Sequence, residues 1–293
     1  MIISIQIENL NSLKEVLNSE CDRVRFGSEF CEFKIPSLNL LKKAYKLITD
    51  RGKEFAYITP KLSNISIRKV KQHLDFLNEN GPINIIFNDL GLLQLLQKYP
   101  NLKPHMGRQL VYIPARCPWP EITVGGSISR WMARRRVEKI FYQTSLNHEL
   151  TIQFFRNYKV ENVDLDWIPK CFPHYDYIVR NGFNLSLHLY LIPVTLTRKC
   201  HMARLLGEKE PEKCSRPCET YGFVLKRKDL GIELFLWGNV VFKMIEPAEK
   251  ELKEAFKIKI SEFVIPLNPL TKIKNEKEIN NIIQLIRSSK SKK

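Results

Sequence analysis

Short β-like runs alternate with amphipathic helical stretches through roughly the first two-thirds of this 293-residue chain. The spacing of the repeat, roughly 25–35 residues, is typical of βα units. Residues 83–89, INIIFND, are apolar enough for a parallel strand that is buried on both faces. The clearest expected helix begins at Ser37 and ends at Gly52, because serine is favoured at the N-cap of a helix and glycine at its C-terminal end. This alternation predicts an α/β fold with a parallel sheet.

We predict a (β/α) TIM-like barrel, complete or incomplete, that forms one domain over residues 1–293. A β-hairpin is expected at 223–237, a Pro-rich excursion at about 110–127, and a basic, solvated tail at about 287–293. The expected strands are 2–7, 22–27, 54–59, 83–89, 160–167 and 183–191. The expected helices are 11–20, 37–52, 65–80, 90–98, 128–142, 146–158, 173–181, 248–256 and 277–288.

Three of the seven cysteines, Cys200, Cys214 and Cys218, fall within nineteen residues of a loop-like segment. Structural zinc sites usually show two closely spaced ligand pairs, which this segment lacks. A local triplet with one distant thiolate is common for iron–sulfur clusters, and the basic neighbours Lys199 and Arg216 suit a negatively charged cluster. The pattern favours an iron–sulfur cluster over zinc, with unpaired cysteines or a disulfide as the remaining alternative.

Chemistry in an α/β barrel lies at the carboxyl ends of the strands. Cys31 follows the expected strand 22–27 and is therefore the best fourth ligand, whereas Cys21 precedes that strand and Cys171 is expected as a packed core thiol. His105 and Arg108 follow a further expected strand end and are weak candidates for catalytic groups in the barrel mouth. Alternatively, His105 is a structural histidine and Arg108 a surface arginine.

Lysine and arginine exceed aspartate and glutamate by 47 − 31 = 16. This excess predicts attraction to RNA or another polyanion at low salt. An equally good explanation is a general lysine bias together with a solvated helix face. The arginines that would bind such a ligand are concentrated in the expected helix 128–142, at Arg130, Arg134, Arg135 and Arg136.

No apolar run approaches the ~20 residues that a membrane-spanning helix needs, so no span is expected. The first residues, MIISIQIE, lack the basic region and small-residue cleavage site of a signal peptide and are expected as a strand. Seven cysteines without obvious pairing favour a reducing, cytoplasmic setting.

A series of short motifs resembles peptidase family U32, the collagenase-like family, and is most similar to its UbiV-type iron–sulfur branch. The likeness covers most of the chain, and its motifs keep the same order along it. The motifs are Arg25-FGSEFC-Glu32, Asn88-DLGLL, Val163-DLDWIPK-Cys171, Pro193-VTLTRKCHMA-Arg204, Cys214-SRP-Cys218 and Leu234-FLWGN-Val240.

The resemblance implies a [4Fe–4S] cluster on Cys31, Cys200, Cys214 and Cys218, with oxygen-independent hydroxylation of a small aromatic or quinone-like substrate. It also implies a second family subunit as partner in a heterodimer. Other members hydroxylate RNA bases, which makes RNA modification or binding the alternative. Residues 187–197 lack the glutamate and glycines of typical members, and the sequence offers no His-Glu-x-x-His motif, so peptidase activity is not expected.

Overall fold

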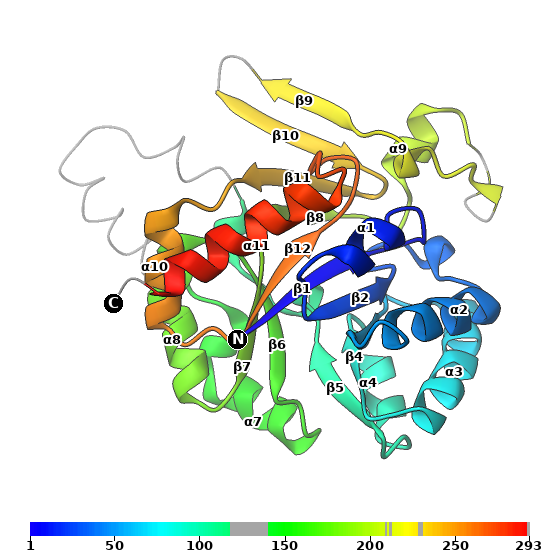
Figure 1. The fold of residues 1–293 in the computed structure, drawn as a ribbon, viewed down its shortest axis with the longest axis horizontal. Helices are drawn as coiled ribbons and strands as arrows, with labels where there is room; N and C mark the ends of the chain where they lie inside the picture. The colour runs from blue at the N-terminus through cyan, green and yellow to red at the C-terminus, as the bar shows by residue number, and fades with distance from the viewer. Residues whose placement is uncertain (118–139, 209, 211–212, 228–230, 292–293) are drawn as a thin grey trace.

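The computed structural model describes residues 1–117, 140–208, 210, 213–227 and 231–291 (Figure 1). Eight parallel strands close into a barrel in the order β1-β12-β7-β6-β5-β4-β3-β2. This closed barrel confirms the predicted fold class and shows that the barrel is complete. Its strands are β1 (Ile2–Ile7), β2 (Arg23–Gly27), β3 (Glu54–Ile58), β4 (Ile83–Phe87), β5 (Leu102–Met106), β6 (Asn162–Asp166), β7 (Asn184–His188) and β12 (Glu262–Pro266).

Helices follow most strands and cover the outside of the barrel (Figure 1). Ser37 caps the second helix as expected, because its side chain accepts a hydrogen bond from the Leu40 amide. No helix in the described residues is long and apolar enough to cross a membrane. The helices around the barrel are α1 (Leu13–Asn18), α2 (Leu38–Thr49), α3 (Asn64–Glu79), α4 (Leu90–Leu96), α7 (Glu149–Asn157), α8 (Phe172–Arg180), α10 (Glu249–Lys257) and α11 (Glu276–Ser291). A further short helix, α9 (His201–Leu205), follows strand β8 (Tyr190–Leu196) of a second sheet.

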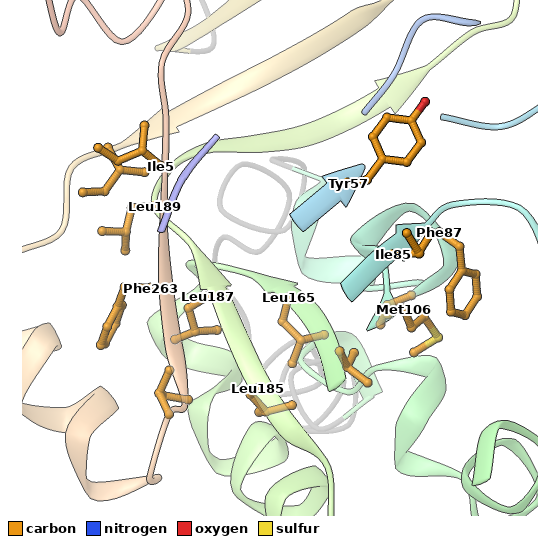
Figure 2. Packing of buried hydrophobic residues seen from close by; sticks show 14 of the residues in the cluster. Ile5, Tyr57, Ile85, Phe87, Met106, Leu165, Leu185, Leu187, Leu189 and Phe263 are labelled. Atoms are coloured by element: carbon orange, nitrogen blue, oxygen red, sulfur yellow. The ribbon is translucent and has the colours of Figure 1, made fainter. Parts of the chain in front are cut away.

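The main hydrophobic core lies between the barrel strands and these helices, and Figure 2 shows part of it. In β7, Leu185 and Leu187 belong to this core, while Ser186 and His188 belong to a separate set of buried polar groups. The alternation follows from the pleat of a strand, which sends successive side chains to opposite faces. The core-facing positions of the strands therefore hold the helices, and the alternate positions fill the barrel interior, with polar groups in β7 and with a small apolar cluster of Ala56, Ile58 and Ile86 in β3 and β4.

A second, antiparallel sheet lies across one end of the barrel (Figure 1). The predicted hairpin is confirmed as β9 (Phe223–Arg227) and β10 (Ile232–Trp237). Two further strands, β11 (Val240–Ile245) and β8 (Tyr190–Leu196), complete the order β8-β11-β10-β9.

The expected strand 183–191 is in fact two strands that belong to different sheets. β7 ends at His188 inside the barrel, and β8 begins at Tyr190, whose φ of 68° is in the left-handed region. Such a backbone conformation redirects the chain abruptly, and non-glycine residues rarely adopt it. The segment that carries the late cysteines therefore leaves from the second sheet and not from a barrel strand.

Two other expectations about the chain differ from the structure. Residues 287–291 form the end of α11, and Arg287 Nη1 lies 2.6 Å from Glu20 Oε2, where a solvated tail was expected. Of the Pro-rich excursion, residues 110–117 include the short 3-10 turn Pro114–Arg116. The rest of the excursion, the expected helix through residue 139 and its four arginines lie outside the described residues.

Candidate metal centre at the barrel rim

Four cysteines line one cavity of about 190 Å³ beyond the carboxyl ends of the barrel strands. We call them the rim cysteines: Cys31, Cys200, Cys214 and Cys218. Cys31 follows β2, and Cys200 precedes the short helix α9 (His201–Leu205). Cys218 lies in the 3-10 turn Pro217–Glu219, and Cys214 lies three residues before that turn. All four are free thiols. The structure thus brings together the four residues that the sequence singled out.

Asn239 joins two of the segments that carry these cysteines. Its side-chain amide lies in the turn between β10 and β11 and donates to the carbonyl oxygens of Phe30, at 3.0 Å, and Thr197, at 2.9 Å. Phe30 directly precedes Cys31, and Thr197 lies three residues before Cys200. One buried side chain therefore fixes the distance between an N-terminal loop and a loop far along the chain.

The same turn closes the wall of the cavity around Cys218. Trp237 Nε1 donates to the Cys218 carbonyl oxygen at 2.5 Å. Gly238 has a φ of 61°, and a Cβ atom at that position would lie 3.9 Å from Cys218 Sγ. Glycine adopts this left-handed conformation at little cost, so the turn can pass close to the sulfur. Cys218 is consequently buried, although it belongs to a loop.

Backbone amides point at two of the sulfur atoms. The Ala203 amide donates to Cys200 Sγ, and the Arg216 amide donates to Cys214 Sγ, both at 3.4 Å. Hydrogen bonds of this kind stabilise the charged form of a thiol, which is the form that binds metals. Hydrogen bonds to sulfur are also a main influence on the reduction potential of iron–sulfur centres.

Burial has the opposite effect at Cys31, Cys200 and Cys218, because it raises the pKa of each thiol and so favours the protonated form in the metal-free chain. It raises the pKa of Cys31 to about 12 and that of Cys218 to about 11. Lys34 partly opposes the shift at Cys218, while the nearby Cys200 and Cys214 add to it. These couplings show that the thiols are close enough to affect one another's charge. A metal bound here would displace protons from them.

The wall of the cavity is rich in positive charge. Lys34, Lys213 and Arg216 line it together with Glu8. Lys34 pairs with Glu8 and also places its Nζ 4.6 Å from the centroid of the Trp237 ring. Lys213 and Arg216 also have carboxylates beside them, Glu210 at 2.7 Å and Glu219 at 3.8 Å, but neither of these carboxylates lines the cavity. The lining itself therefore favours a negatively charged occupant.

Within the described residues, no group of three or more His, Cys, Asp or Glu side chains is arranged to hold a metal ion. The rim cysteines share a cavity but do not converge as the ligands of one ion do. Of the other cysteines, Cys171 is fully buried in the hydrophobic core, as expected, and Cys21 is buried at the opposite end of β2. Cys117 lines a different cavity.

The sequence placed both His105 and Arg108 after a strand, and only Arg108 lies there, in the 3-10 turn that follows β5. His105 is inside β5, and its Nε2 lies 2.7 Å from Asp164 Oδ1. Arg108 is 1% exposed and donates to Glu29 Oε1 at 2.6 Å and to Asp166 Oδ1 at 2.9 Å. Both side chains are already paired with carboxylates of the protein, so neither is free to bind an anionic ligand.

The contact between His105 and Asp164 belongs to a buried network that the sequence did not reveal. We call it the interior network: Arg25, His105, Asp164, His188 and Glu262. Burial alone would raise the pKa of Asp164, but the charges of Arg25, His105 and His188 lower it well below the usual value. The sequence pattern that could have revealed this network is a polar residue at every second position of β2 and β6.

Comparisons with known proteins add no family assignment. No family profile and no curated protein matches the sequence. Among solved structures, a U32 peptidase is similar over 92% of this chain and 93% of its own, at 12% identity and a TM-score of 0.45.

Two other barrel enzymes give similar values. Thiamine phosphate pyrophosphorylase from Pyrococcus furiosus has 8% identity and a TM-score of 0.46, over 98% of this chain and 95% of its own. Orotidine 5'-monophosphate decarboxylase from Methanocaldococcus jannaschii has 9% identity and a TM-score of 0.46, over 97% and 98%. Because values this low do not distinguish one activity from another, the site must be interpreted from its own residues.

Proposed function

We propose that the rim cysteines hold one [4Fe–4S] cluster and that the chain serves oxygen-independent hydroxylation of a small aromatic or quinone-like substrate. The chain would act as the enzyme or as one subunit of it. The observation that carries the proposal is the convergence of four free thiols, from separate segments of the chain, on one cavity at the carboxyl end of a closed barrel. Four cysteine thiolates are the usual ligands of such a cluster.

The arrangement of the thiols favours a cluster over a single zinc ion. The four thiolates of a [4Fe–4S] cluster each bind a different iron, so they stand further apart than four ligands of one ion. The four thiols line one cavity, and their spacing along the sequence is not that of two closely spaced zinc-ligand pairs. Structural zinc would need the four sulfur atoms around one point.

The surroundings of the cavity also fit an anionic cluster. Lys34, Lys213 and Arg216 line the cavity, each with a carboxylate beside it, and would moderate the negative charge of the cluster; the amides of Ala203 and Arg216 already donate to sulfur. A buried charge without such partners would be costly. Trp237 and Phe30 provide apolar walls that limit the access of water. When bound, the cluster would supply one-electron chemistry.

The hydroxylation part of the proposal rests on the resemblance of the motifs to the UbiV-type branch. Peptidase chemistry has little support, because His105 and His188 are buried and both contact Asp164 inside the barrel. A base must be able to reach the substrate. The +16 charge keeps RNA as a second candidate substrate, and co-purifying RNA would show as a high ratio of absorbance at 260 nm to that at 280 nm.

Metal analysis of a cysteine panel tests the cluster. Protein prepared without oxygen should carry about four irons and four sulfides per chain, and each rim cysteine changed to alanine should lose most of the iron. The matched controls are Cys171→Ala and Cys117→Ala, which remove a thiol outside the cavity and should keep wild-type iron. Full iron in Cys31→Ala would remove that residue from the ligand set.

A further inference from the structure

A second cavity, of about 530 Å³, adjoins the cysteine cavity at the barrel rim. We call it the rim pocket. The segment after β1 lines one side of it, and residues 267–274, which follow β12, line another. Carboxyl ends of barrel strands are where (β/α) barrels bind their substrates, and the volume suits a small organic ligand.

The two cavities share the residues that separate them: Glu8, Lys34 and Trp237. Trp237 bonds to the Cys218 carbonyl through Nε1, and Lys34 lies against its ring. A ligand in the rim pocket would therefore lie directly behind the wall of the candidate metal centre.

The balance of charge in the rim pocket is positive. Its two carboxylates already have cations beside them: Glu8 pairs with Lys34, and Glu219 Oε1 lies 3.8 Å from Arg216 Nη1. Lys272 and Lys274 are exposed and form no ion pair with any described residue. Two ammonium groups are thus left to meet an anion.

Two asparagine side chains add neutral donors to this pocket. Asn9 Oδ1 accepts from the Asn11 amide at 2.9 Å, and Asn268 Oδ1 accepts from the Leu270 amide at 2.9 Å. These bonds fix the two side-chain amides through their oxygens. The two Nδ2 groups have no hydrogen-bond partner among the described residues, so they remain available to a carboxylate or phosphate oxygen.

The rest of the wall is apolar. Ile7, Leu267 and Ile273 line the pocket together with the indole ring of Trp237. Apolar walls with a few convergent polar groups are typical of sites for small organic molecules. An inorganic anion would use only the polar part of this surface.

We propose that the rim pocket binds a small organic anion, a carboxylate with an apolar or aromatic body, held by Lys272 and Lys274 against Trp237. Binding itself is independent of the cluster. Only the role of this anion as a substrate rests on the proposed function.

Calorimetric titration with phenylacetate tests the proposal on the full chain prepared without oxygen. Phenylacetamide is the neutral probe of the same shape, and inorganic phosphate is an anion without the apolar body. Phenylacetate should bind more tightly than either, and the affinity should fall as salt is raised. Equal affinity for phenylacetate and phenylacetamide would overturn the proposal, as would phosphate binding as tightly as phenylacetate.

The variant Lys272→Gln/Lys274→Gln should weaken phenylacetate binding by about fivefold or more. The matched control, Lys277→Gln/Lys290→Gln, removes two exposed lysines of α11 outside the pocket and should leave binding unchanged. If both variants weaken phenylacetate binding equally, the effect comes from the overall charge of the protein, and the proposed site is contradicted. Iron is measured on the same samples. Charge-selective binding in a chain that takes up no iron would overturn the proposed function and leave the rim pocket standing.

Discussion

The interior network and the cysteine cavity lie in the same barrel, yet they satisfy their buried groups in different ways. Inside, Arg25 donates to Asp164 and Glu262, and all three side chains are fully or almost fully buried. At the rim, four thiols line one cavity without bonding to one another, and burial keeps at least Cys31 and Cys218 protonated. The interior pairs its charged groups with one another, although His188 Nδ1 has no hydrogen-bond partner among the described residues. The rim cysteines would gain partners by binding a ligand.

Breaking the interior network should have the largest effect. Arg25→Met would leave Asp164 and Glu262 buried without their main cation and should cost about 3–5 kcal/mol of unfolding free energy in urea. If this variant does not fold, Arg25→Met/Glu262→Gln removes one of the stranded charges and should recover part of the loss. A loss of less than ~1 kcal/mol would show that the network contributes little.

A buried neutral histidine on α3, His73, should make stability depend on pH. Burial, with the charge of Lys69, lowers the pKa of His73 to about 4, and its Nδ1 lies 2.7 Å from the Tyr57 hydroxyl. The unfolded chain binds a proton near pH 6.5, so the free energy of unfolding should fall as pH drops from about 6.5 towards 4. The loss assigned to His73 is about 2–3 kcal/mol.

The control for that prediction is His73→Gln, which keeps a polar partner for Tyr57 but does not titrate. The difference in unfolding free energy between wild type and His73→Gln should shrink as pH falls through this window. A difference that is independent of pH between 4 and 7 would rule out a neutral His73 as the cause.

Loosening the cysteine cavity should have a smaller effect on stability and a clear effect on metal retention. Asn239→Ala removes the donor from two carbonyl oxygens and should cost about 1–3 kcal/mol. Iron should also leave faster in the presence of a chelator, because the loops that carry Cys31 and Cys200 are no longer tied together. Asn181→Ala removes an exposed amide far from the cavity and serves as control.

Local patterns were sufficient to predict the barrel and the position of Cys31. A residue that directly follows a parallel strand must lie at the carboxyl rim, whatever the rest of the fold does. The same reasoning excluded Cys21, which precedes the strand. These inferences needed only the order of strands and loops, which hydrophobic periodicity reveals well.

Side-chain direction within a strand was harder to predict. Pro104 obscured β5, so His105 was placed after a strand when it lies inside one. The sequence of the expected strand 183–191 gave no sign of the break between β7 and β8, because the left-handed conformation falls on Tyr190 and not on a glycine. β12 was missed although Pro266 ends it and the Asn268-Pro269 turn signal follows it, because its five residues are short for a recognisable strand pattern. Such features depend on tertiary contacts more than on local propensity.

Mössbauer spectroscopy of ⁵⁷Fe-labelled protein, prepared without oxygen, tests the central claim most directly. It separates the irons of a cluster from a single iron held by four sulfur atoms. Our account predicts the spectrum of one [4Fe–4S] cluster, with about four irons per chain, in wild type and in Cys171→Ala, and its loss in Cys200→Ala. A single mononuclear iron, or one zinc per chain without iron, would contradict it.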